Sequence, residues 1–293
     1  FMILWQQGSS EREQHPMIAL ASPDRSGVQL QLSDGKTISL AKVLEVKETD
    51  GRNVATNDTT GIVYQNMQED ILREEEIKYN TVITPRGTEY LLTLSDGSRV
   101  WLNSDSRLRF PVTFAKGIRR VELTGEGYFE VAKDPSKPFQ VEMNGASITV
   151  LGTHFNVKAD AESDDITATL VEGSIRFEGA KQNIVMTPNQ QLTFNRSTNK
   201  VDVKEIDTDT FTAWKDGLLK YKSIPFTELI ENLKDIYQVE IRIDDERLAD
   251  PSITVSGTFN QKQSIEQILK VISHSLPIRW TNKTGNYHIQ HAH

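Results

Sequence analysis

The sequence predicts a mainly β N-terminal region followed by a small α+β region. From Gly27 to about Glu205, β-branched and aromatic residues alternate with polar ones, the pattern of half-buried strands. Turn pairs such as Asp34-Gly35 separate these runs and favour tight hairpins. After Asp207, apolar residues at helical spacing alternate with short strand patterns. We therefore expect antiparallel hairpins arranged as a sandwich or a solenoid, and then a helix-containing region.

The N-terminal region contains two expected hairpins of the same design. Residues 28–32 lead into a turn at 34–35, and residues 92–94 lead into a turn at 96–97. Duplication and convergent hairpin chemistry both explain this likeness. Two copies do not establish a solenoid, which needs at least about three units.

The segment between the two hairpins is polar. Residues 45–80 predict a long surface loop with one short strand at 61–64. After the second hairpin the period-two pattern continues, and further strands are expected at residues 141–143, 148–150, 155–157, 175–177 and 201–203.

The C-terminal region combines helices with strands. Residues 208–215 predict a short helix that ends at Gly217, because Gly favours the position after a helix. Pro225 opens an amphipathic helix, and Ser264 begins a capping box at the start of a second one. Strands are expected at residues 218–221, 239–243, 253–259, 278–280 and 287–289. The predicted order is βαββαββ.

Composition argues for binding rather than catalysis. Lys and Arg number 33 against 41 Asp and Glu, and the net charge of -8 is a poor match for nucleic acid. The absence of Cys excludes a disulfide scaffold, a thiolate zinc site and a cysteine nucleophile. No phosphate-binding glycine loop and no triad pattern occurs. We therefore predict no catalytic, cofactor or metal site.

The first five residues, Phe1 to Trp5, are apolar and precede a polar stretch. They are too few to span a bilayer, which takes about 20 residues. From these residues alone, two interpretations stay open: the trailing end of a membrane helix, or an incidental apolar terminus.

Six short motifs follow one another between Thr84 and Gly217. In order they are residues 94–103 (LSDGSRVWLN), 123–131 (LTGEGYFEV), 138–141 (PFQV), 150–157 (VLGTHFNV), 171–174 (VEGS) and 214–217 (WKDG). Together they resemble the periplasmic part of FecR-like anti-sigma factors. Asn189 departs from the Gly that is usual in this family, and Asn also tolerates positive φ. The C-terminal region resembles the short secretin and TonB N-terminal signalling domain that ends such proteins in Bacteroidetes.

The resemblance implies the periplasmic sensor region of a single-pass inner-membrane regulator. It implies that the N-terminal signalling domain of an outer-membrane TonB-dependent transporter is the partner. A sigma factor of the ECF type would bind a cytoplasmic segment that is missing from this sequence, and periplasmic and intramembrane proteases would relay the signal. The implied division is a membrane-proximal linker at 1–22, an all-β FecR-like domain at 23–206, a linker helix at 207–217 and an α+β signalling-type domain at 218–290.

A different class of function is also compatible with the residues. A carbohydrate-binding or carbohydrate-active β domain would use surface aromatic residues, for which Tyr64, Tyr79 and Tyr90 are the candidates.

Two structural expectations follow from the strand patterns. Alternation places Phe129 inside the β core, and Trp214 is expected to pack at the junction of the two regions. Residues 252–259 contain no charge and are expected to form an open strand edge that pairs with the partner. The predicted partner-binding residues are Ile253, Thr254, Val255 and Ser256. A central, already paired strand is the alternative.

Overall fold

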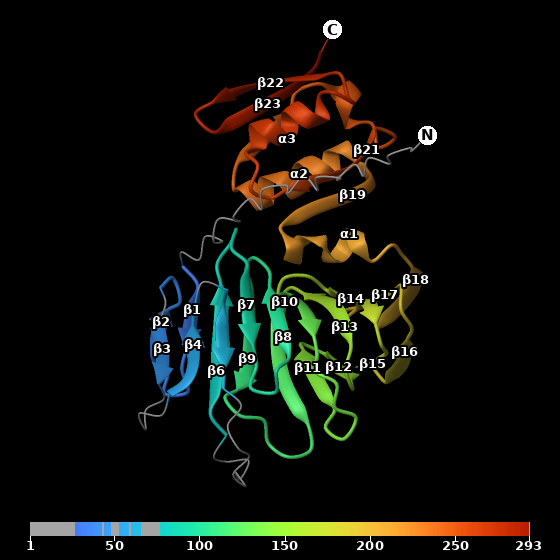
Figure 1. Cartoon of the computed structure of the whole chain (residues 1–293). Helices are drawn as coiled ribbons and strands as arrows, with labels where there is room; N and C mark the ends of the chain where they lie inside the picture. Colours follow the sequence, from blue (N-terminus) through green and yellow to red (C-terminus); the bar gives the residue numbers. More distant parts are fainter. Residues whose placement is uncertain (1–26, 43, 48–52, 59, 66–76, 293) are drawn as a thin grey trace, which may run out of the picture.

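The computed structural model describes residues 27–42, 44–47, 53–58, 60–65 and 77–292. Strands make up 51% and helices 13%, in a large curled sheet followed by a small α+β region, which confirms the predicted fold class. Figure 1 shows the α+β region above the β region. The expected linker at 1–22, with its apolar start, lies outside the described residues. In the part of the chain that is described, no helix has the length and apolar character needed to cross a membrane.

The β region is built from two layers that share one long strand. The strands are β1 (Gln29–Gln31), β2 (Thr37–Ser39), β3 (Leu44–Lys47), β4 (Asn53–Asn57), β5 (Ile62–Tyr64), β6 (Tyr79–Thr84), β7 (Tyr90–Thr93), β8 (Arg99–Leu102), β9 (Ser106–Pro111), β10 (Arg119–Glu130), β11 (Phe139–Met143), β12 (Ala146–Val150), β13 (His154–Ala159), β14 (Asp165–Glu172), β15 (Ile175–Gly179), β16 (Gln182–Met186), β17 (Gln190–Asn195) and β18 (Lys200–Glu205). One layer runs β2-β1-β6-β9-β10-β11-β12-β15-β16, and the other runs β3-β4-β5-β7-β8-β10-β13-β14-β17-β18.

Strand β10 crosses from one layer to the other. Its first half pairs with β9 and β11, and its second half pairs with β8 and β13. Gly125 lies at the change of layer with a φ of +93°, and a Cβ there would lie 2.4 Å from Oγ of Ser106. Only glycine fits both the backbone conformation and the close approach of β9.

The core of the β region lies between the two layers. Phe129 is fully buried, as its place in the alternating pattern predicted. Its ring stacks on Phe155 of β13 at a centroid distance of 5.1 Å and meets Phe139 edge-on at 6.3 Å. These three rings pack the two layers together at β10, the strand that the layers share.

The expectation of a long loop at 45–80 is wrong in part. Besides the expected short strand, the segment contains β4 and all but the first residue of β3. Asn57 explains why a polar stretch forms a buried strand. Its Nδ2 donates to the carbonyl oxygens of Leu40 at 3.0 Å and Lys42 at 2.6 Å, so the buried amide is satisfied. This polar residue therefore makes internal hydrogen bonds and does not indicate exposure to solvent.

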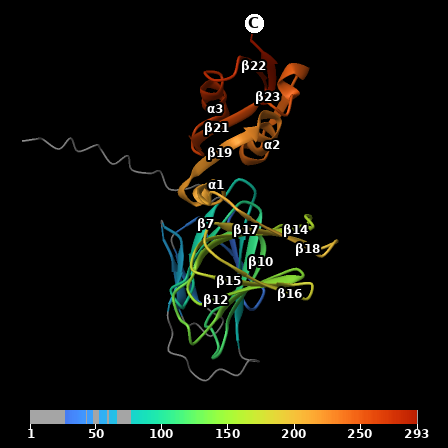
Figure 2. The ribbon, with the colours of Figure 1, turned by 90° about the vertical axis from the view of Figure 1, so that its right-hand side faces the viewer.

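The α+β region has the predicted βαββαββ order. Its elements are β19 (Leu218–Pro225), α2 (Phe226–Tyr237), β20 (Glu240–Ile243), the 3₁₀ turn η3 (Glu246–Ala249), β21 (Thr254–Asn260), α3 (Ile265–Ile272), β22 (Ile278–Lys283) and β23 (Asn286–His291). Strands β19 and β21 form one sheet, and β20, β23 and β22 form the other. The helices lie between the two sheets (Figures 1 and 2), and the buried apolar residues form a core of their own.

A short linker joins the two regions. The expected single helix at 208–215 is instead one α turn, α1 (Asp209–Thr212), followed by one 3₁₀ turn, η2 (Ala213–Asp216). Gly217 ends the linker in the left-handed conformation at a φ of +69°, as the preference of Gly for this position predicted.

Candidate interaction surface and domain junction

The strand β21 is paired on one side. Among the described residues its partner is β19, in antiparallel register. The amide of Gln261 donates to the carbonyl of Gly217, and the amide of Phe226 donates to the carbonyl of Ile253. Backbone groups in a strand alternate in direction, so the odd-numbered residues of β21 face β19. The N–H and C=O groups of Thr254, Ser256 and Thr258 therefore point to the open edge.

The four predicted partner-binding residues play different parts in this geometry. Thr254 and Ser256 are exposed and direct their backbone groups outward. Val255 is buried, and the carbonyl of Ile253 is bonded to Phe226. The side chain of Val255 fixes the strand on its core, and Thr254 and Ser256 present the edge. Whether a partner binds there stays a prediction.

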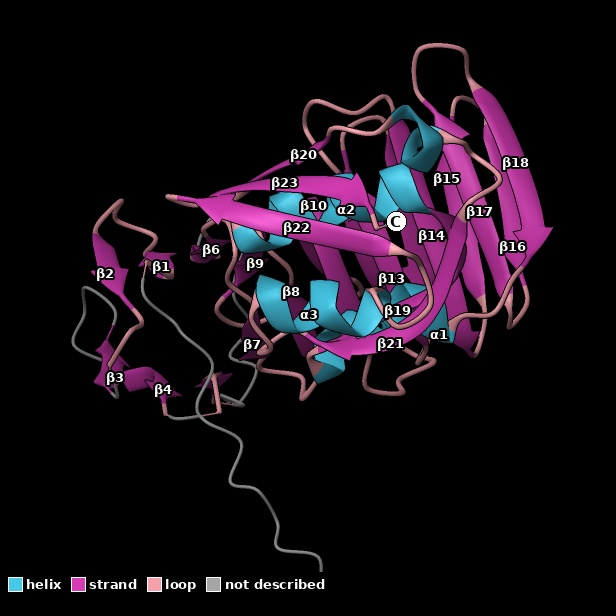
Figure 3. Cartoon of the chain, turned by 90° about the horizontal axis from the view of Figure 1, so that it is seen from above, coloured by secondary structure: helices cyan, strands magenta, loops and turns pink. Residues whose placement is uncertain are grey.

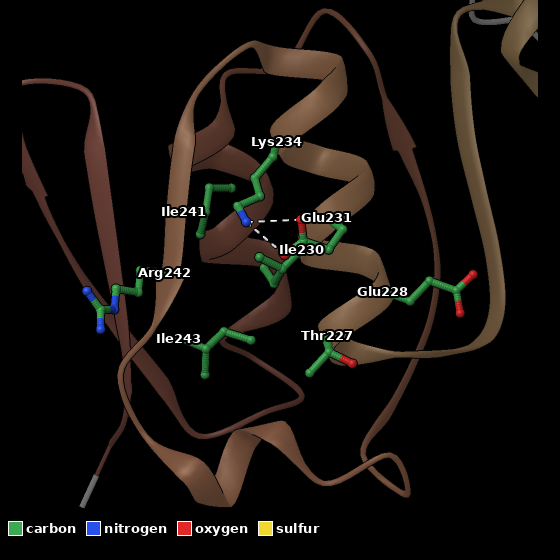
Figure 4. A pocket seen from close by; sticks show the side chains of 8 residues that line it. All are labelled: Thr227, Glu228, Ile230, Glu231, Lys234, Ile241, Arg242 and Ile243. Atoms are coloured by element: carbon green, nitrogen blue, oxygen red, sulfur yellow. Dashed lines mark hydrogen bonds and ion pairs between the residues drawn. The ribbon is translucent and has the colours of Figure 1, made fainter. Parts of the chain in front are cut away.

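Within the described part of the chain, β20 leaves a second open edge, on the opposite side of the region from β21 (Figure 3). Strand β20 pairs in parallel with β23, and the amide of Asp244 donates to the carbonyl of Ile289. By the same alternation, Ile241 and Ile243 direct their backbone groups away from β23. Between this edge and α2 lies a groove of about 440 Å³ (Figure 4), with Ile230 on its floor. Sequence reasoning missed this edge, because alternation alone does not show which strand has a neighbour.

A chain of hydrogen bonds joins the linker to the β region. Glu126 of β10 accepts from Nδ2 of Asn103 at 3.0 Å and from Nδ2 of Asn156 at 2.8 Å. Oδ1 of Asn156 accepts from the indole N–H of Trp214 at 3.2 Å. Trp214 is buried at this junction, where the sequence predicted it. The indole only donates and a charged carboxylate only accepts, so Asn156 is held in one orientation between them.

Lys215 adds an aromatic contact next to this chain. Its Nζ lies 5.2 Å from the ring centroid of Tyr128 and 5.8 Å from that of Trp101. The two rings meet edge-on at 5.9 Å. Tyr128 lies on the face of β10 opposite Phe129, yet it is buried because the linker covers it.

Two carboxyl groups at the junction are perturbed by their surroundings. Burial raises the pKa of Glu89 to about 7, against a hydrogen bond from Gln261 that lowers it, and the charges of Glu126 and Asp216 raise it further. Burial also raises the pKa of Glu126, although its bonds from the two asparagine amides oppose this. Glu89 belongs to the β region and Gln261 to the α+β region, so this contact also crosses the junction.

The aromatic residues of the carbohydrate alternative do not form a surface. Tyr64 and Tyr90 are 3% and 2% exposed, within the core of the β region, so the expectation that they lie on the surface is wrong. Tyr64 accepts from Nδ2 of Asn80 at 2.9 Å, and Tyr90 donates to Asn57. Tyr79 is half-buried and covered by the guanidinium of Arg109 at 3.9 Å. In the described ranges, no group of three or more His, Cys, Asp or Glu residues has the arrangement of a metal site.

Comparisons with known proteins identify the family. The FecR protein family model matches residues 80–176, and the model of the FecR C-terminal region matches residues 218–289. The curated proteins gave no significant match. Two crystal structures of proposed anti-sigma factors from Parabacteroides distasonis ATCC 8503 are similar to this chain. One is 29% identical, and the similarity covers 73% of this chain and 100% of that one; the other is 28% identical and covers 73% and 99%, and both have a TM-score of 0.60. The two family matches together span more than half of the sequence, and the chain belongs to the FecR family as a FecR-like anti-sigma factor.

Proposed function

We propose that this chain is the periplasmic sensor region of a transmembrane anti-sigma factor. It receives a signal from an outer-membrane TonB-dependent transporter by protein contact and controls the release of an ECF-type sigma factor. The anti-sigma assignment follows from the family, and the transporter and the type of sigma factor are parts of the proposal. No reaction is catalysed by this region. The observation that carries the proposal is the open, uncharged edge of β21 within the segment that matches the FecR C-terminal region.

The proposed location is the periplasmic side of the inner membrane, with a single membrane span and the sigma-binding segment outside this sequence. Periplasmic and intramembrane proteases complete the relay. Membership in a family of anti-sigma regulators supports these parts of the proposal.

The proposed contact is strand addition by the signalling domain of the transporter at Ile253, Thr254, Val255 and Ser256. A strand edge offers unpaired N–H and C=O groups, and an incoming strand satisfies them without a preformed pocket. The side chains of Thr254, Ser256 and Thr258 are small and uncharged, so they oppose neither a backbone approach nor a particular charge. Such an edge suits recognition by main-chain bonds.

Two matched variants test the proposal. Thr254→Pro removes the backbone N–H that points outward. Thr254→Val keeps this N–H and has a side chain of similar shape. Binding of the chain to signalling domains of TonB-dependent transporters from the same genome is measured by isothermal titration calorimetry. We expect Thr254→Val to bind like the unmodified chain and Thr254→Pro to bind at least about tenfold more weakly, the cost of about one main-chain hydrogen bond. Circular dichroism melts confirm that both variants fold.

Two outcomes contradict the proposal. If no signalling domain from the genome binds the unmodified chain, the transporter is not the partner. If Thr254→Pro is folded and binds with unchanged affinity, the edge of β21 is not the contact.

A further inference from the structure

The last strand of the β region, β18, has an open edge. Among the described residues its neighbour is β17, in antiparallel register, and no described element lies beyond it (Figures 1 and 3). The amide of Ile206 donates to the carbonyl of Asn189 at 2.9 Å, so the even-numbered residues of this strand face β17. The N–H and C=O groups of Val201, Val203 and Glu205 therefore point to the open side.

We propose that two copies of this chain pair at this edge, β18 against β18, and form a symmetric dimer. In the proposed antiparallel register, Val203 lies on the two-fold axis, opposite Val203 of the second copy. The three outward residues of each strand then face those of the other strand, as main-chain pairing requires. The layer that contains β18 continues from one copy into the next, and both copies use the same surface.

The apolar side chains of β18 leave the core of the β region incomplete at this edge. Val201 and Val203 lie opposite Phe194 and Leu192 of β17, which are buried, so all four share the inward face of the layer. Val201 packs in part against the core, and Val203 is 39% exposed. Opposed residues of paired strands have Cβ atoms about 4.5–5.5 Å apart. Pairing therefore covers apolar surface of Val203 that is otherwise in contact with solvent.

Two charges on the other face of β18 favour a second copy as the partner. Asp202 and Lys204 are exposed, and within the described part of the chain neither makes an ion pair. In the proposed register, Asp202 lies opposite Lys204 of the second copy. The two-fold axis repeats this pair on its other side. Opposite charges directly across two strands stabilise their pairing, so the edge is complementary to itself.

The same charges disfavour the neighbouring registers. A shift by two residues in one direction sets Asp202 opposite Asp202 and Lys200 opposite Lys204, and a shift in the other direction sets Lys204 opposite Lys204. Like charges directly opposite each other destabilise a strand pair. Edge strands often carry charges that keep other strands away. On β18 the charges oppose both shifted registers and favour the one that is centred on Val203.

Sedimentation equilibrium over a range of protein concentrations tests the proposal. Because one strand pair is a small interface, we expect a weak dimer whose fraction rises with concentration. Asp202→Lys and Lys204→Asp each turn both cross-strand pairs into pairs of like charge. Each variant alone should therefore have a dimer Kd about tenfold higher than the unmodified chain. An equimolar mixture of the two variants restores opposite charges in both pairs, and it should dimerise like the unmodified chain.

Glu178→Lys on β15 is the matched control for Asp202→Lys. It makes the same change of charge at an exposed residue of the other layer, and it should dimerise like the unmodified chain. Both substitutions make the net charge of -8 less negative, so an effect of net charge alone would strengthen the association of both variants. Circular dichroism checks that every variant is folded.

The proposal is overturned if the unmodified chain stays monomeric at concentrations up to about 1 mM. It is also overturned if the two single variants are folded and dimerise as tightly as the unmodified chain. A mixture of the two variants that stays monomeric where the unmodified chain dimerises contradicts the proposed register. None of these outcomes depends on a transporter, because β18 belongs to the β region and the proposed transporter contact lies at β21.

Discussion

Replacing Phe129 by Ala tests the account of the β core. The side chain is fully buried where β10 passes between the layers, so truncation leaves a cavity that the flanking strands cannot close. Replacing a buried Phe by Ala lowers the free energy of unfolding by about 3–5 kcal/mol. Phe129 also loses its stack on Phe155 at 5.1 Å and its edge contact with Phe139, each worth about 0.5–1.5 kcal/mol, which places the expected loss in the upper half of that range.

Urea unfolding followed by circular dichroism measures this loss. The two regions have separate apolar cores, so we expect two transitions, of which only that of the β region moves in Phe129→Ala. Val185→Ala is the matched control, because Val185 is 63% exposed in the same region and should change the free energy of unfolding by less than about 0.5 kcal/mol. A loss below about 1 kcal/mol for Phe129→Ala refutes the packing argument.

Three further predictions concern charges and a helix cap. Arg119 is 2% exposed and donates to the partly buried Asp96 at 2.7 Å, so Arg119→Leu removes the cation of this pair and should cost the β region about 3–5 kcal/mol in urea. Asp96 keeps its hydrogen bonds from Ser98, and recovery in the double variant with Asp96→Leu checks the cause. Ser264 forms a capping box at the start of α3, and Ser264→Ala should lower the stability of the α+β region by about 1 kcal/mol, with Ser264→Asp as the control that keeps a cap. Hydrogen bonds from Arg247 hold the pKa of Asp245 well below its usual range. The stability that this pair contributes is therefore present above pH 3.8 and is lost as the pH falls. When the melting temperature is measured against pH, Asp245→Asn should flatten the acid limb of the curve.

The positions of side chains relative to the core followed from local alternation where a strand has one face on the core. Phe129 is the clearest case, because β10 is long and its inward residues meet the other layer. The same alternation did not show that Tyr128 is buried. Its burial depends on the linker, about 85 residues further along the chain, which folds back over that face.

The sequence did not show which strands lie at the edges of the sheets. Residues 252–259 read equally as an edge strand or as a central strand, because strand order depends on pairings between distant segments. The register between β19 and β21 shows which backbone groups of Thr254 and Ser256 are free, and the pairing of β20 with β23 shows a second edge. The hydrogen bond from Trp214 to Asn156 joins residues 58 apart in the sequence. The sequence predicted that Trp214 packs at the junction, but it did not predict Asn156 as its partner.

Hydrogen exchange reports which amides a partner covers, so it shows whether the transporter domain binds at the open edge of β21. Exchange of the backbone amides of this chain is compared with and without a bound signalling domain of a TonB-dependent transporter. We expect slower exchange at Thr254, Ser256 and Thr258, whose amides face the open edge, with little change in the β region. Protection confined to the β region, with residues 218–289 unchanged, would contradict this expectation.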